Sequence, residues 1–153
     1  MLSQKAKYGL KALIYLARNP SPTGTRIADI AESECIPRKF LDAILLELKK
    51  DGVVASRIGR AGGYRLAQAP ETIGIGQVIR VLDGPLAPIP CASRTAYRPC
   101  PDCKDVEACL IRRAMQEARD AMASVLDTMS LAELVASGGL ARAPAPVRDF
   151  SRV

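Results

Sequence analysis

Three helical patterns followed by a glycine-rich hairpin pattern occupy the first 66 residues, and this order limits the possible folds more than any other feature of the chain. Apolar residues recur at helical spacing in 6–17, 27–31 and 40–48. Two β-prone runs, 53–57 and 64–66, then flank a turn that contains three glycines. Short helices that lead into a two-stranded hairpin are the order of elements in a winged helix-turn-helix. The chain is therefore predicted to be mainly α-helical and to form this fold in its N-terminal half.

Positive charge is concentrated in the same segment. The 153-residue chain has 22 Lys and Arg against 16 Asp and Glu, a net charge of +6. Residues 1–65 hold 12 of the cations and 6 of the anions, whereas residues 66–153 hold 10 of each. A basic segment favours a polyanion as partner, because each Lys or Arg that neutralises a phosphate releases counterions. Together with the order of helices, the charge predicts double-stranded DNA as the partner.

The second helix of a helix-turn-helix lies in the major groove, with its first residues at the base edges. Arg38 could bind a guanine or a phosphate through its forked guanidinium, Lys39 supplies a point charge, and Asp42 could accept a hydrogen bond from cytosine N4. In the hairpin, two arginines flank a tip narrow enough for the adjacent minor groove. The alternative is that these residues are solvated surface charges. The candidate DNA-binding residues are Arg38, Lys39, Phe40, Asp42, Arg57, Arg60, Gly62, Gly63 and Tyr64.

Four of the five cysteines fall within 19 residues. They are Cys91, Cys100, Cys103 and Cys109. In an intracellular protein such a cluster is more often a metal or redox site than a set of structural disulfides. A Cys-x2-Cys pair places two thiolates on one ion or cluster, and two more could close a four-sulphur shell. Arg94, Arg98 and Lys104 would lower the pKa of the nearby thiols. Cys35 stands apart and is expected to be a small core residue.

A long helical pattern follows the cysteine-rich loop, from about 107 to 129. Its apolar residues gather near one face but find few apolar partners in the rest of the chain. We expect this helix to pair with its copy across a twofold axis, in a homodimer that reads a palindromic operator. The predicted organisation is a winged helix-turn-helix DNA-binding domain (1–84), a cysteine-rich sensor loop (85–106), a dimerisation helix with a short terminal helix (107–137) and a disordered tail (138–153).

Five segments carry a resemblance to a known family. They are KAKYGL at 5–10, IADIA at 27–31, IPRKFL at 36–41, GGYRL at 62–66 and LAELV at 131–135. From Leu2 to about Val135 the chain resembles the iron–sulphur cluster regulators, the Rrf-two superfamily of winged helix-turn-helix transcription factors. The resemblance implies a dimeric DNA-binding regulator, most often a repressor. It also implies a 2Fe-2S or 4Fe-4S cluster, which many members hold on three loop cysteines.

The resemblance also implies a set of ligands. In the family the last two ligand cysteines are typically separated by five intervening residues, as Cys103 and Cys109 are, and Cys91 falls where the first ligand is expected. Well-known members complete the shell with a histidine or with an N-terminal acidic residue. This chain has no histidine, and Lys7 and Tyr8 occupy the relevant N-terminal stretch. We therefore expect the extra cysteine, Cys100, to complete an all-thiolate site.

Other functions are compatible with the same residues. A cluster-free regulator could hold structural zinc on these cysteines or switch by disulfide formation. In another class, an iron–sulphur electron carrier could use its basic segment to dock an acidic partner. An enzyme is not expected, because no histidine, phosphate loop, acid pair or nucleophile with a base is present. No apolar run approaches the ~20 residues of a membrane-spanning helix and no cleavable leader is recognised, so we expect a cytoplasmic protein.

Overall fold

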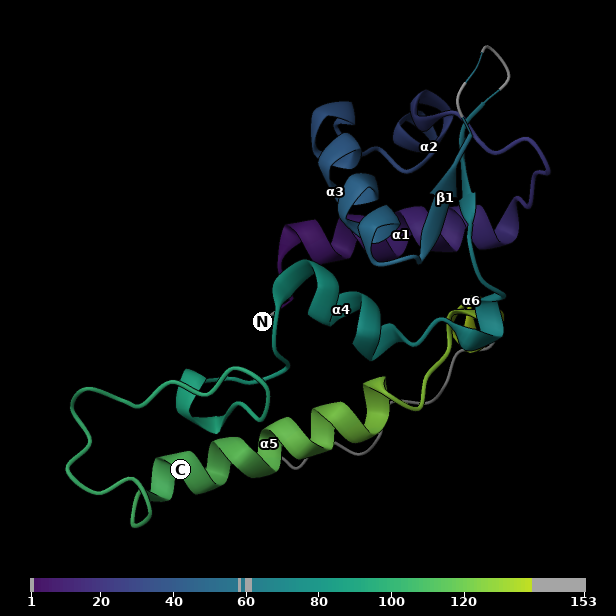
Figure 1. Ribbon diagram of the computed structural model, residues 1–153. Coiled ribbons are helices and arrows are strands. Elements are labelled where there is room, and N and C mark those ends of the chain that lie inside the picture. Colours follow the sequence, from purple (N-terminus) through teal and green to yellow (C-terminus); the bar gives the residue numbers. More distant parts are fainter. Residues whose placement is uncertain (1, 58, 60–61, 139–153) are drawn as a thin grey trace, which may run out of the picture.

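The computed structural model describes residues 2–57, 59 and 62–138 and shows a helical head with one long helix beneath it (Figure 1). In chain order the elements are α1 (Gln4–Arg18), α2 (Ile27–Ser33), α3 (Arg38–Lys50), β1 (Val54–Ser56), β2 (Tyr64–Leu66), the 3-10 turn η1 (Pro70–Thr72), α4 (Ile75–Asp83), the 3-10 turn η2 (Pro90–Ala92), α5 (Leu110–Leu126) and α6 (Leu131–Ser137). The predicted winged helix-turn-helix, mainly helical with one small hairpin, is confirmed. The tail beyond Gly138, predicted to be disordered, lies outside the described residues.

Helix α1 is the central helix of the head and contacts α3, α4, α6 and β2. Ser3 starts it, because its Oγ accepts the Ala6 N–H at 3.1 Å. At Gly9, a Cβ atom would overlap the Leu82 side chain of α4 and lie 3.3 Å from Ile44 Cγ2 of α3. Glycine at this position therefore lets three helices approach one another closely.

The core of the head is aliphatic, in a chain with no Trp, two Phe and four Tyr. Its largest fully buried side chains are Leu13, Ile30, Leu41, Ile44, Leu45, Leu48, Val53, Val54, Ile73, Val78 and Leu131. Burial of each such side chain contributes about 1.5–3 kcal/mol to folding. These residues come from α1 to α4, β1, α6 and the segments between them, and none comes from α5. The long helix is therefore attached to the core of the head without being part of it.

The turn between α2 and α3 sets the start of the recognition helix. Helix α3 begins at Arg38, with Pro37 in the position directly before it. Cys35 adopts a positive φ of 53° and is exposed. The expectation that Cys35 is a core residue is therefore wrong. Ile36, which is 3 % exposed, takes the core position instead. The left-handed backbone at Cys35 turns the Cys35 side chain outward.

Helix α5 is shorter than predicted by about three residues at each end. It begins at Leu110, because the Cys109 thiol directly before it caps the helix by accepting the N–H of Arg112, one of the free N–H groups of the first turn, at 3.4 Å. Before it, the Asp105 carboxylate accepts the N–H groups of Glu107 and Ala108 and holds a turn rather than a helix. The start of the long helix is thus fixed by one of the loop cysteines.

Two attachments join α5 to the rest of the chain, one at η2 and one at α4. At the C-terminal end, Asp127 pairs with Arg80 of α4 at 2.5 and 2.9 Å. The backbone just beyond joins the head, since the Ile75 N–H donates to the Met129 carbonyl at 2.9 Å. Between these attachments α5 runs below the head (Figure 1). Within the described residues, no helix is both long enough and apolar enough to cross a bilayer.

Candidate DNA interface and cysteine site

A basic groove of about 420 Å³ lies between the helix-turn-helix and the wing, the hairpin of β1 and β2. Arg38, in the first turn of α3, lines it on the helical side. Arg57, directly after β1, lines the wing side together with Gly62, Gly63 and Tyr64. The structure therefore brings five of the predicted DNA-binding residues to one concave surface.

Arg26, which was not among the predicted residues, lines the same groove. It is the residue before α2 and pairs with Asp29, one turn into that helix, at 2.9 Å. The hydrogen bond to Asp29 raises the pKa of Arg26. Its place directly before a helical pattern was the one sequence signal that could have indicated it.

The other predicted residues of α3 lie elsewhere around the helix. Lys39 and Asp42 are exposed. Phe40 is 60 % exposed and lies on the side toward α1, where it lines an apolar hollow of about 370 Å³ with Tyr8. Phe40 is therefore separated from the basic groove. Arg60 of the wing lies outside the described residues.

Gly63 fixes the wing against the segment that precedes α2. Thr25 and Tyr64 exchange two backbone hydrogen bonds, each 2.8 Å long. A Cβ atom at Gly63 would overlap the Thr25 carbonyl and lie 2.8 Å from Thr25 N. Glycine is therefore required here for close backbone approach, whatever contact it makes with DNA.

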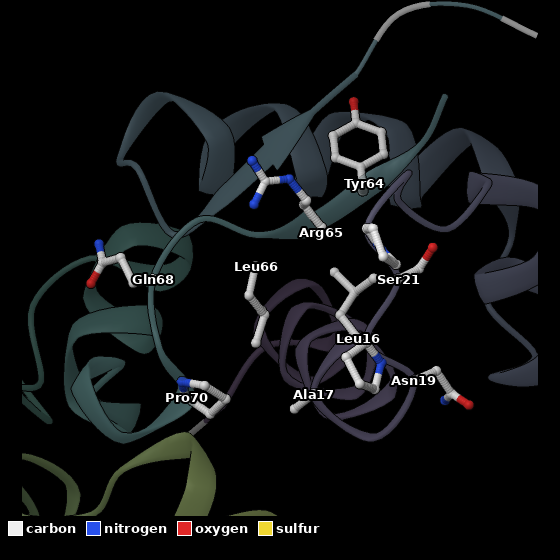
Figure 2. A pocket seen from close by; sticks show the side chains of 11 residues that line it. Leu16, Ala17, Asn19, Ser21, Tyr64, Arg65, Leu66, Gln68 and Pro70 are labelled. Atoms are coloured by element: carbon white, nitrogen blue, oxygen red, sulfur yellow. The ribbon is translucent and has the colours of Figure 1, made fainter. Parts of the chain in front are cut away.

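A second pocket, of about 430 Å³, lies between β2 and the end of α1 (Figure 2). Leu66 is directed toward Leu16 and Ala17 of α1, whereas Tyr64 and Arg65 point away from that helix. The residues that line this pocket include no carboxylate and no thiol. Its apolar contacts pack the wing on α1.

The four loop cysteines divide into one buried thiol and three neighbouring thiols. Cys91 lies on η2 and is 6 % exposed. The thiols of Cys100 and Cys109 lie near enough to that of Cys103 to raise its pKa. No three Cys, Asp or Glu side chains within 2–57, 59 and 62–138 converge on one point as metal ligands do. The three thiols are therefore neighbours without a common centre, and Cys91 is separate from them.

Hydrogen bonds raise the pKa of two of these thiols, Cys100 and Cys103. The Cys100 thiol donates to Asp102 Oδ1 at 2.8 Å, and this bond raises the pKa of Cys100. The hydrogen bond with Cys100 is the main cause that raises the pKa of Cys103 to about 12. The lowering expected from nearby basic residues is therefore wrong for these two thiols. One of those residues, Arg94, pairs instead with Asp120 of α5 at 3.0 Å.

Two arginines of α5, which the sequence did not indicate, bind the cysteine loop. Arg112 donates through Nε to the Cys91 carbonyl at 3.2 Å and through Nη1 to the Val106 carbonyl at 3.4 Å. Arg119 donates through Nη1 to the Ala92 carbonyl. Their spacing of two turns places both on one face of α5. A basic residue in a helix is ordinarily solvated, so the sequence carried no signal for these contacts.

A sequence model of the Rrf2 family, described as an iron-dependent transcriptional regulator, matches residues 2–137. The chain belongs to the Rrf2 family. The resemblance drawn from its sequence motifs is thereby confirmed. Rrf2 proteins are DNA-binding transcriptional regulators and not enzymes, which agrees with the basic groove described above.

Relatives match nearly the whole chain. An Rrf2-like HTH-type transcriptional regulator of Rhodobacter capsulatus is 46 % identical over 141 residues, which cover 90 % of this chain and 94 % of that protein. Protein rrf2 of Nitratidesulfovibrio vulgaris is 34 % identical over a match that covers 91 % of this chain and 89 % of that protein.

Solved structures of similar proteins have the same fold. CymR, the global cysteine regulator of B. subtilis, is 31 % identical with a TM-score of 0.70, and the match covers 89 % of this chain and 96 % of CymR. IscR of T. potens is 25 % identical with a TM-score of 0.71, and the match covers 90 % of this chain and 88 % of IscR.

Proposed function

We propose that this Rrf2-family protein is a homodimeric repressor that acts in the cytoplasm on a palindromic operator, under the control of a cofactor or of thiol chemistry on its loop cysteines. The position of Cys109 carries the proposal. Its thiol lies near that of Cys103 and also caps the start of α5. A chemical change at the Cys109 sulphur would therefore also affect the start of the long helix. Membership of a regulator family argues against the alternative of an electron carrier.

The reading head, residues 2–84, would bind DNA with α3 in the major groove and the wing in the adjacent minor groove. Arg38, in the first turn of α3, would bind a guanine or a phosphate, and Asp42 would accept from cytosine N4. Arg57 and Arg60 would bind the backbone beside the wing tip. Arg26 adds a third guanidinium to the described groove. Three arginines around one groove favour a duplex over a small acidic ligand.

A free apolar face on α5 supports the homodimer. Ile111 is 69 % exposed, Met122 39 % and Val125 55 %. Ala114 and Ala121, which are also exposed, fall on the same face at spacings of three and four residues. Exposed apolar surfaces of this kind mark protein interfaces. A second copy would cover the face, because a stripe on a single helix can pair with itself across a twofold axis.

The chemistry of the four thiols suits an iron–sulphur cluster. Three thiols are already neighbours, and a fourth lies on η2 of the same loop, so the loop can offer the four thiolates that such clusters use. The proposed ligands are Cys91, Cys100, Cys103 and Cys109. When bound, a cluster supplies a group that responds to iron supply, oxidants or nitric oxide. Structural zinc on the same thiols, or a disulfide among them, is the alternative.

The described residues connect the loop to the reading head. Any rearrangement of the three thiols changes the cap that Cys109 gives to the Arg112 N–H. At the other end of the helix, Asp127 pairs with Arg80 of α4 in the head. In a dimer built on α5, a shift of this helix would alter the spacing of the two recognition helices. A coupling free energy of about 1–3 kcal/mol is typical of such linked sites.

Metal, sulphide and visible-absorption analysis of anaerobically purified protein tests the proposal. We expect iron together with acid-labile sulphide and a visible absorption band. Cys100→Ser and Cys103→Ser should each remove most of the iron, because each takes away one of four thiolates. Cys35→Ser is the matched control, since this exposed thiol lies in the head, and it should leave the iron content unchanged. Zinc without sulphide would overturn the cluster, and an unchanged spectrum in Cys100→Ser would show that another group completes the shell.

A further inference from the structure

Two guanidinium groups of α5 bind the two consecutive carbonyls of the first cysteine segment. Arg112 Nε donates to the Cys91 carbonyl at 3.2 Å, and Arg119 Nη1 donates to the Ala92 carbonyl. Hydrogen bonds from a charged donor are stronger than those between neutral groups. Since η2 packs on α5, these bonds are the polar part of the contact that holds Cys91 in place.

Both guanidinium groups are also fixed on their other sides. The Arg119 side chain is 10 % exposed and pairs with Asp120 at 2.8 Å, and Asp120 pairs in turn with Arg94 of the loop at 3.0 Å. The Arg112 guanidinium lies 5.9 Å from the ring centre of Tyr97, also in the loop. Neither arginine is a mobile surface cation, so a movement of η2 would be resisted by α5.

We propose that Arg112 and Arg119 form a clamp that couples the position of Cys91 to that of α5. In the structure, Cys91 is buried, the other three thiols are part-exposed, and Cys91 is not among the thiols that act on Cys103. It can join them only if η2 shifts, and η2 can shift only if it moves α5 or leaves the clamp. Leaving the clamp is costly, because Arg119 would remain buried without its carbonyl partner. The clamp therefore turns recruitment of Cys91 into movement of the helix, a step that rests on the proposed function.

Alkylation of the reduced, metal-free protein tests the clamp independently of any cofactor. Peptide mass spectrometry would give the iodoacetamide rate of each thiol in wild type, in Arg112→Gln/Arg119→Gln and in Arg113→Gln. We expect Cys91 to react about tenfold faster in the double variant, because local opening exposes it. The rates of Cys100 and Cys103 should stay within about twofold. The control substitutes an exposed arginine of the same helix and should leave every rate unchanged. An unchanged Cys91 rate in the double variant would overturn the clamp, and the single variant Arg112→Gln serves if the double variant does not fold.

Operator affinity tests the coupling itself. The ratio of affinities between cofactor-loaded and cofactor-free protein should fall toward one in Arg112→Gln/Arg119→Gln and persist in Arg113→Gln. A merely structural role would lower both affinities and leave their ratio intact, and that result would overturn the coupling. If the loaded and free forms of the wild-type protein bind the operator equally well, the proposed function fails. The alkylation rates still decide whether the clamp holds Cys91.

Discussion

Substitution of Val125 by glutamate is expected to convert the dimer into monomers and to weaken operator binding by about 10²–10⁴-fold. Val125 is 55 % exposed on the apolar face of α5. In an isologous interface each substitution enters twice, so Val125→Glu would place two carboxylates in an apolar contact. A monomer binds one half-site and loses the gain in affinity that comes from linking two. Light scattering after gel filtration and fluorescence anisotropy with a labelled operator would measure the two effects.

The matched control for Val125→Glu is the neighbouring Ser124→Glu. Ser124 is also exposed but lies a helical step away from the apolar face. The same charge at this position should leave the dimer and the operator affinity nearly unchanged. A Val125→Glu protein that stays dimeric would show that α5 is not the dimer interface.

Substitution of Gly63 by alanine is expected to displace the wing and to lower the free energy of unfolding by about 2–4 kcal/mol. The new Cβ would overlap the Thr25 backbone, so the paired hydrogen bonds between Thr25 and Tyr64 would break. Arg57 would move with the wing, and operator affinity would fall by at least about tenfold, as expected for loss of one good set of groove contacts. Thermal denaturation and operator titration below the transition would measure both effects.

Gly74→Ala is the control for the Gly63 substitution. Gly74 precedes α4 with an ordinary φ of −76°, and the nearest atom to an added Cβ is 4.0 Å away. This change should cost no more than about 1 kcal/mol and leave operator affinity intact. Equal losses in the two variants would contradict the role assigned to close approach at Gly63.

The head could be predicted from sequence because its patterns are local. Apolar spacing located α1, α2 and α3, and the glycine-rich turn located the wing. The errors arose where one residue decides the outcome. The cap by Cys109 delays the start of α5, since a thiol is an uncommon capping group. A single positive φ turns Cys35 outward, and periodicity does not encode that torsion angle.

The candidate site could be predicted only as a set of residue types. The spacing of the cysteines indicated a thiol site, but it did not show that Cys91 is buried away from the other three. Nor did it show that Arg112 and Arg119 bind carbonyls 21 and 27 residues earlier in the chain. Such contacts depend on how the loop folds back on α5. The raised pKa values of Cys100 and Cys103 depend on the same folding, because it brings Asp102 and the neighbouring thiols to them.

The most direct test of cofactor control is an anaerobic operator titration of the same protein preparation with and without its cofactor, at one fixed salt concentration. The two forms should differ in affinity by about 5–150-fold, which corresponds to a coupling of about 1–3 kcal/mol. Cys103→Ser should bind the operator with one affinity under both conditions, because it lacks the central thiol of the group. Equal affinities of the loaded and free wild-type protein would contradict control of the reading head by the cysteine loop.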